Sequence, residues 1–172
     1  MKRVAFAALC LGLAACGQEA EAPKKAEVPA KLAAGTYEVT ATVKSLASTD
    51  KTPVPTFAKV GDTVKSQGCV GDDGLPAPEL LAAKGDQCTV TDPYVRSGRM
   101  NVTLDCNRKG QGKVMTIFNG KYDAEGFSGS LNANSSFSGP GDYTLVEEIT
   151  ARKVADQCSA AGADTKTAAK KS

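Results

Sequence analysis

Alternating apolar and polar side chains mark several stretches of this chain as β-strands, because neighbouring residues of a strand point to opposite faces of a sheet. One such stretch covers residues 36–46, and a weaker one covers residues 57–65. From Cys88 onward the pattern continues as a meander whose segments are separated by short turns that contain Gly or Asp. The first stretch has a fully apolar face, which consists of Tyr37, Val39, Ala41 and Val43.

Two predicted hairpins bring apolar residues opposite one another, which is stronger evidence for a sheet than either strand alone. The first hairpin turns at residues 96–98. Its one poor fit is Asp92 opposite Val102, and because Pro93 follows, we expect a β-bulge there. Its apolar pairs are Cys88–Cys106, Val90–Leu104 and Tyr94–Met100.

The second hairpin turns at residues 139–141, and turns near residues 108–110 and 121–123 complete the meander. The pairing that this turn predicts again places apolar residues on one face. The expected pairs are Phe137–Tyr143, Ser135–Leu145 and Leu131–Ile149.

We therefore expect an all-β domain, with a single antiparallel, strongly curved sheet of about seven strands and one apolar face. To cover that face, the sheet must curl into a half-barrel or a closed barrel, or split into a sandwich. One short helix is expected at residues 78–84, because Pro78 stands at its start and Gly85 lies just past its end.

The N-terminal residues are typical of a bacterial export signal. Lys2 and Arg3 precede an apolar run at residues 4–15, which is too short to cross a bilayer as a helix. The run ends in Leu13-Ala14-Ala15-Cys16, which resembles a lipobox. This resemblance implies cleavage before Cys16 and acylation of that residue, which would anchor the protein stably in a membrane. The alternative is an ordinary secretory signal with a chance cysteine.

The same pattern predicts how the chain is organised. Residues 1–15 are the signal peptide, 16–34 the lipidated cysteine and a solvated tether, 35–158 the β domain, and 159–172 a disordered tail. Gly17 is not the Asp that commonly retains lipoproteins at the inner membrane, so the periplasmic face of the outer membrane is favoured. The membrane is thus the expected partner, through the lipid at Cys16, and the domain is expected to be a monomer.

Composition narrows the possible functions. The chain has 21 basic and 19 acidic residues, and two basic ones, Lys2 and Arg3, leave with the signal peptide, so the mature chain is neutral. A neutral chain lacks the basic surface that nucleic-acid binding requires. Histidine is absent, so neither a catalytic His nor an imidazole zinc site is available, and we expect no metal and no cofactor.

Four cysteines remain in the predicted domain, and an even number in an oxidising compartment suggests disulfides. Three pairings are possible. The hairpin register favours Cys88–Cys106, which leaves Cys69–Cys158. A redox or metal site is the alternative, but there is no CxxC motif and no His.

Five short stretches of the predicted domain surround its cysteines and its first strand. They are Gly35-Thr36-Tyr37-Glu38-Val39-Thr40, Ser66-Gln67-Gly68-Cys69, Cys88-Thr89-Val90-Thr91-Asp92, Leu104-Asp105-Cys106 and Arg152-Lys153-Val154-Ala155-Asp156-Gln157-Cys158. Together these stretches resemble the domain of unknown function 3617 family of bacterial envelope proteins. The chain departs from the family pattern in its few Met residues and in Ala151, where Gly is common. The resemblance implies a periplasmic β domain with structural disulfides, and it transfers no activity.

The sequence contains no residue pattern that is typical of a catalytic site. Glu147 and Glu148 are adjacent on a strand and must point to opposite faces, and Arg108 and Lys109 are interpreted as solvated charges. We therefore expect a non-enzyme that binds a small apolar or lipid-like ligand on its concave face or rim, with Tyr37 and Tyr143 as the ligand-facing residues. The alternative is a structural or interaction protein of the envelope with a filled core.

Overall fold

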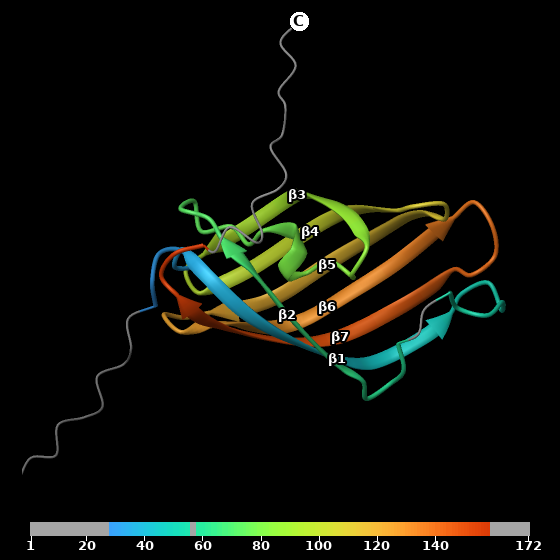
Figure 1. The fold of residues 1–172 in the computed structure, drawn as a ribbon, viewed down its shortest axis with the longest axis horizontal. Helices are drawn as coiled ribbons and strands as arrows, with labels where there is room; N and C mark the ends of the chain where they lie inside the picture. The colour runs from blue at the N-terminus through green and yellow to red at the C-terminus, as the bar shows by residue number, and fades with distance from the viewer. Residues whose placement is uncertain (1–27, 56–57, 159–172) are drawn as a thin grey trace, which may run out of the picture.

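The computed structural model describes residues 28–55 and 58–158, and it contains one antiparallel sheet that curls into a half-barrel (Figure 1). The strand order is β2-β1-β7-β6-β5-β4-β3, so all neighbours except β1 and β7 follow one another along the chain. The predicted all-β fold is confirmed, and the sheet stays open because β2 and β3 are its two edges. The strands are β1 (Gly35–Ser48), β2 (Thr63–Val70), β3 (Asp86–Arg96), β4 (Arg99–Arg108), β5 (Gly112–Tyr122), β6 (Gly126–Phe137) and β7 (Tyr143–Ala155).

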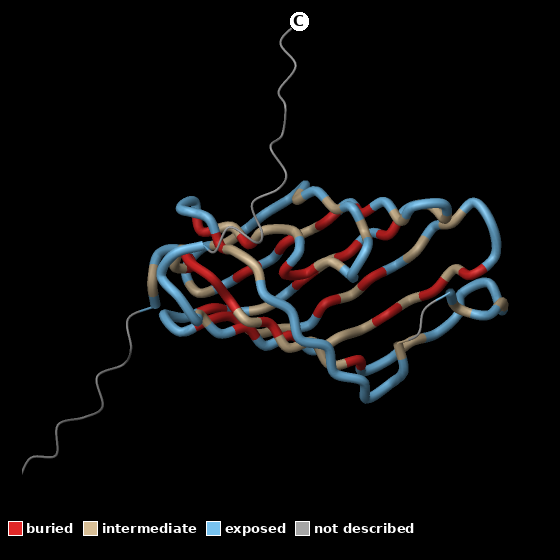
Figure 2. Tube along the Cα trace, viewed as in Figure 1, coloured by how far each residue is buried: buried red, intermediate tan, exposed pale blue. Residues whose placement is uncertain are grey.

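The core lies on the concave face and is built by the alternation that the sequence shows. Buried and exposed residues alternate along most strands (Figure 2). Gly120 and Gly129 face each other across β5 and β6, where a side chain at either position would meet main-chain atoms within 2.3 Å. Such close approach lets the sheet bend sharply. The largest fully buried side chains include Tyr37, Phe118, Leu32, Met100, Leu104 and Ile149.

The predicted helix at residues 78–84 is wrong. Only a 3-10 helix, Pro78–Leu80, forms there, and the N–H groups of Leu81 and Ala82 both bond to the carbonyl oxygen of Pro78. One turn is too short to offset the cost of helix nucleation. The segment is fixed instead by burial of Leu80 and Leu81 between the two edge strands.

The second strand also differs from its prediction of residues 57–65. It runs over Thr63–Val70, and most of its side chains are exposed, so hydrophobic alternation could not locate it. Its position is fixed by an unbroken register with β1, from Gly35 opposite Val70 to Thr42 opposite Thr63.

The predicted hairpin registers hold only in part. Cys88–Cys106 and Val90–Leu104 pair as expected, and the predicted bulge lies between Val90 and Asp92. Beyond the bulge the register shifts by one, so Tyr94 faces Asn101 and points outward, and its predicted pairing with Met100 is wrong.

In the second hairpin the register is displaced by two residues. Leu145 faces Ala133 and not Ser135, so the predicted faces are right although the predicted partners are wrong. The turn is longer because Asp142 closes it, with its carboxylate accepting bonds from the Ser135 hydroxyl at 2.9 Å and the Phe137 N–H at 2.8 Å.

The ordered chain begins before residue 35, so the prediction that the whole of residues 16–34 is a solvated tether is wrong for its last part. Leu32 is 0% exposed. The hydroxyl of Tyr122 donates to the carbonyl oxygens of Pro29 and Ala30 at 3.2 and 3.0 Å. The predicted signal peptide (1–15), Cys16 and the predicted tail (159–172) lie outside the described residues.

Candidate functional site

The concave face is where the sequence predicts a ligand, with Tyr37 and Tyr143 touching it. The structure places Tyr37 in the core at the end where β1 begins, and its side chain is 0% exposed. Its hydroxyl donates to the carbonyl oxygen of Ala33 at 2.7 Å, and its ring lies 5.9 Å from that of Phe127. Burial, reinforced by the negative charge of Asp123, raises the pKa of Tyr37 to about 12. Tyr37 is therefore a neutral core residue without a surface open to a ligand.

Tyr143 lies at the opposite end of the concave face and is 2% exposed. Its ring contacts that of Phe137, with centroids 6.0 Å apart. The guanidinium carbon of Arg108 lies 5.6 Å from the Tyr143 centroid and 5.8 Å from the Phe137 centroid. Burial raises the pKa of Tyr143, although the charge of Arg108 opposes this shift. The ring of Tyr143 is thus covered by a side chain of the same protein.

Arg108 is held in place by a buried ion pair. Its Nε and Nη2 atoms donate to the two carboxylate oxygens of Asp86 at 2.7 and 2.8 Å. The side chains of Arg108 and Asp86 are only 18% and 2% exposed. The bonds to Asp86 raise the pKa of Arg108 above its usual value, against the effect of burial. The interpretation of Arg108 as a solvated charge is therefore wrong.

A second carboxyl group, that of Glu147, also points to the concave face. Its neighbours across the strands are Val43 on β1 and Leu131 on β6. Burial beside these apolar side chains raises the pKa of Glu147. Glu148 is exposed on the outer face, where its carboxylate binds the Lys44 ammonium at 2.6 Å. The prediction that the two glutamates point to opposite faces is confirmed.

These groups form one charged and aromatic set, which we call the inner cluster. In this cluster the Arg108 guanidinium donates two hydrogen bonds to the Asp86 carboxylate on the neighbouring strand. Within residues 28–55 and 58–158, no three His, Cys, Asp or Glu side chains are grouped to hold a metal ion, and no buried side-chain nitrogen or oxygen lacks a hydrogen bond. The arrangement is suited to fixing one end of the half-barrel. The inner cluster consists of Asp86, Arg108, Phe137, Tyr143 and Glu147.

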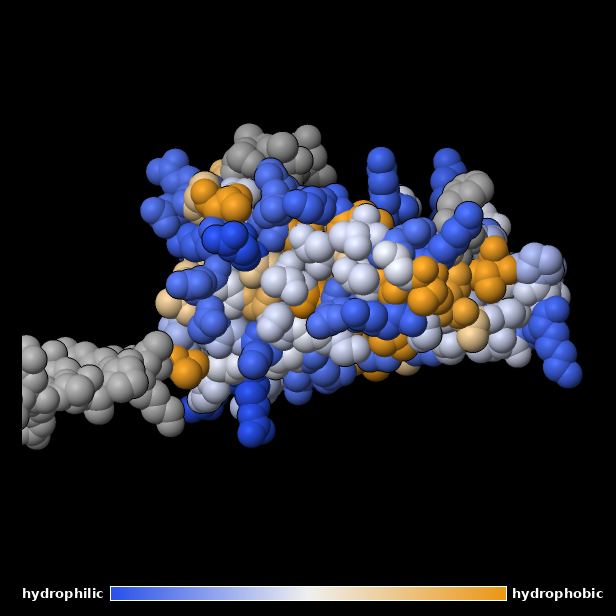
Figure 3. All heavy atoms as spheres, turned by 90° about the horizontal axis from the view of Figure 1, so that it is seen from below, coloured by the Kyte–Doolittle hydropathy of each residue, from blue (hydrophilic) through white to orange (hydrophobic). Residues whose placement is uncertain are grey.

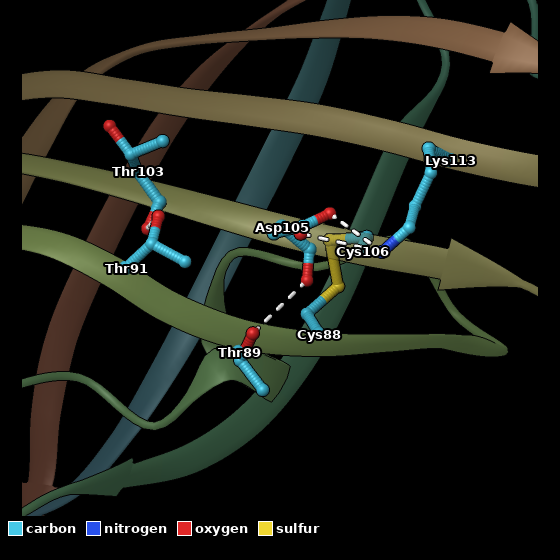
Figure 4. A network of polar contacts seen from close by, with 7 residues as sticks. All are labelled: Cys88, Thr89, Thr91, Thr103, Asp105, Cys106 and Lys113. Carbon is cyan, nitrogen blue, oxygen red and sulfur yellow. Dashed lines mark hydrogen bonds and ion pairs between the residues drawn. A yellow bond between two sulfur atoms is a disulfide. The ribbon is translucent and has the colours of Figure 1, made fainter.

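Two disulfides hold the edges of the sheet. Cys88 on β3 is bonded to Cys106 on β4, its register partner (Figure 4). Cys69 near the end of β2 is bonded to Cys158, which follows β7, so the bond fixes the end of the described chain to an edge strand. The first bond is the one that the hairpin register predicts, and the second is the pair that this prediction leaves.

Two hollows of the surface do not contain the tyrosines that the sequence singled out. The larger has a volume of about 550 Å³ and lies over β5, β6 and β7, where Lys121, Ser130 and Glu148 project from the outer face. The smaller, of about 420 Å³, lies beside the β5–β6 turn and the end of β7. Both are wide open to solvent.

The two edge strands differ in how open they are. β3 is interrupted by its bulge and carries Pro93, which has no N–H to offer a further strand. β2 has neither a bulge nor a proline. At its end, the carbonyl oxygen of Cys69 accepts the N–H of Ala77, so that part is covered. The remaining stretch, residues 63–68, is the more regular edge, and we call it the β2 edge.

The hydrogen-bond pattern shows which main-chain groups of the β2 edge point outward. The Val43 N–H donates to the carbonyl oxygen of Asp62 at 2.9 Å. Because pairing alternates along an antiparallel ladder, Thr63, Lys65 and Gln67 direct their main-chain groups away from β1. In the described part of the chain, no main-chain group bonds to these outward positions.

Exposed apolar side chains accompany this edge. Val64 is 55% exposed and pairs with Ala41, which places it on the concave side of the β2 edge. Val60, just before β2, is 64% exposed. Figure 3 views the domain from the side on which β1 and β2 lie, and apolar atoms form a band there among hydrophilic ones.

A family model for proteins of unknown function, DUF3617, matches residues 32–158. The chain belongs to the DUF3617 family. The match begins at Leu32, which in the described part of this DUF3617 protein is the first residue buried in the core. No curated protein and no solved structure matches the chain. In the described residues of this DUF3617 protein, no helix has the length and apolar character needed to cross a membrane.

Proposed function

We propose that this protein is a lipid-anchored domain of the bacterial cell envelope that works by binding another envelope protein and not by catalysis. The Leu13-Ala14-Ala15-Cys16 sequence supports the anchor, and Gly17 favours the periplasmic face of the outer membrane. The inner cluster supports a non-catalytic role, because its arginine is already bonded to Asp86.

The observation that carries this proposal is the open β2 edge. Lys65 and Gln67 direct main-chain groups outward that no described main-chain group bonds, and Val64 adds an exposed apolar side chain beside them. A strand of a partner can extend the sheet at such an edge, with main-chain bonds giving affinity and side-chain contacts giving specificity. The opposite edge, with its bulge and Pro93, is protected against such pairing.

A second candidate function is binding of an apolar ligand on the concave face. It is favoured by three partly buried apolar side chains that pack against the core, those of Leu46, Val54 and Phe137. Val54 belongs to the β1–β2 connection, so displacement of this connection would uncover apolar surface. The buried positions of Tyr37 and Tyr143 make this the weaker proposal.

Replacing Gln67 by Pro tests the β2 edge directly. The change removes an outward N–H that β1 does not use, and the proline ring blocks an added strand. We expect capture of the partner in intact cells, by a photo-crosslinking residue at Val64, to fall at least about tenfold. The matched variant Gln67→Thr keeps the N–H and should retain the crosslink.

Urea unfolding of both variants checks that the sheet remains folded. Equal crosslinking of folded Gln67→Pro and wild-type protein would contradict strand addition at this edge.

A further inference from the structure

We infer that the domain docks on anionic phospholipid through the end from which its N-terminal segment leaves. This inference rests on the proposed lipid anchor, which would hold the domain beside a membrane. The contact surface lies on the outer face of β3, β4 and β5, and we call it the basic patch. It consists of Tyr94, Arg96, Arg99 and Lys121.

Strand register places the three cations of the basic patch side by side. Arg96 pairs with Arg99 across the β3–β4 hairpin, and Arg99 pairs with Lys121 on β5. Side chains directly opposite in an antiparallel sheet share a face, with Cβ atoms about 5 Å apart. All three are exposed, and in the described part of the chain none of them forms an ion pair with a carboxylate. Like charges at this spacing repel, so an anionic surface would relieve the repulsion.

Tyr94 gives the basic patch an interfacial side chain. It lies two residues before Arg96 on β3, so both point to the outer face, and it is 49% exposed. Tyrosine is enriched at membrane surfaces, because its ring is apolar while its hydroxyl stays hydrated. An exposed tyrosine beside arginines therefore suits the headgroup region of a bilayer.

The N-terminal segment leaves the domain beside the turn that joins β3 to β4. A Cβ atom at Gly98 would lie 2.7 Å from Cγ1 of Val28, so Val28 packs directly on the turn between Arg96 and Arg99. Both features lie at the end of the half-barrel where β1 begins, on the left in Figure 1. The chain from Cys16 to Val28 can span at most about 43 Å even when fully extended. An anchor at Cys16 would thus keep the basic patch near the lipid surface.

Among the residues that the structure describes, no acidic side chain at this end forms an ion pair with the basic patch. Asp123, in the β5–β6 turn, uses its carboxylate to accept the N–H groups of Glu125 and Gly126 at 2.8 and 3.0 Å. Lys84 and Lys109 are exposed cations at the opposite end of the half-barrel, and Lys59 is an exposed cation beside the middle of β1, just before β2. They provide a matched control for charge alone.

A single tryptophan can report docking, because the protein has none. The full lipidated protein carrying Tyr94→Trp would be reconstituted in vesicles of phosphatidylcholine alone or of phosphatidylcholine with phosphatidylglycerol. We expect the emission to shift to the blue only with phosphatidylglycerol and to return at high salt. A reporter away from the basic patch, Val60→Trp beside the middle of β1, should not shift.

Neutralising Arg96, Arg99 and Lys121 together, each by Ser, should reduce the ratio of docked to undocked protein about a hundredfold. The matched control, Lys59, Lys84 and Lys109 each changed to Ser, should leave the shift of Trp at position 94 unchanged. Urea unfolding confirms that both triple variants fold.

The inference is overturned if emission at position 94 is the same in both kinds of vesicle, or if the control variant loses the shift equally. Failure of the anchor would be seen separately, as protein that does not sediment with vesicles of either composition. A blue shift caused by added phosphatidylglycerol vesicles would then still support the basic patch.

Discussion

Replacing both Cys69 and Cys158 by Ser should lower the free energy of unfolding by about 4–5 kcal/mol, as measured by urea unfolding under oxidising conditions. The bond joins residues 89 apart in sequence, so it closes most of the domain into one loop and restricts the unfolded chain strongly. It also ties β2, which is hydrogen-bonded to β1 on one side only, to the segment after β7.

The Cys88–Cys106 bond is the matched comparison, because it joins residues only 18 apart. Replacing both by Ser should cost about 3 kcal/mol in the same model of loop closure. A larger loss from the shorter loop than from the longer one would show that packing, and not loop closure, sets the contribution of these bonds.

Arg108→Ala should destabilise the domain by about 3–5 kcal/mol, because it leaves the carboxylate of Asp86 buried without its partner. That side chain is 2% exposed and receives two bonds from the guanidinium. The substitution also uncovers the rings of Phe137 and Tyr143. The loss would be measured as the change in urea midpoint at constant slope.

Two further variants separate burial from charge. The double variant Asp86→Leu and Arg108→Met removes both charges together and should be close to wild type, because no buried charge is left unpaired. Lys113 forms an ion pair with Asp105 at 3.2 Å, and the two side chains are 62% and 53% exposed (Figure 4). Because both are exposed, Lys113→Ala should lower the free energy of unfolding by less than about 1 kcal/mol. A double variant as unstable as Arg108→Ala would contradict this account.

Alternation predicted the sheet because one face of each central strand is buried. It located the turns of the meander and the bulge near Asp92, and it placed Leu104 and Leu145 on the correct face. Exact partners beyond a bulge or turn were not predictable, since one inserted residue reverses the face of Tyr94. The side chain of Asp142, which lengthens the last turn, has the same kind of effect on register.

Other elements depend on contacts that the local pattern does not contain. β2 is an exposed edge held by β1, so its side chains show little alternation. The segment before Gly35 reads as a tether by composition, yet Leu32 is its one large apolar side chain near the domain and is fully buried. The inward position of Arg108 in the inner cluster was predictable, because the alternation that buries Leu104 continues to Arg108 and places it on the same face.

The described side chains of the protein fill the concave face, and we propose that a covalent lipid at Cys16 holds the domain to the membrane. Native mass spectrometry of the protein extracted from membranes tests both parts in one measurement. We predict a chain that begins at Cys16, with acyl mass added, two disulfides and no further bound molecule after detergent is removed. A retained non-covalent ligand of defined mass, or an unacylated chain cleaved elsewhere, would contradict the account.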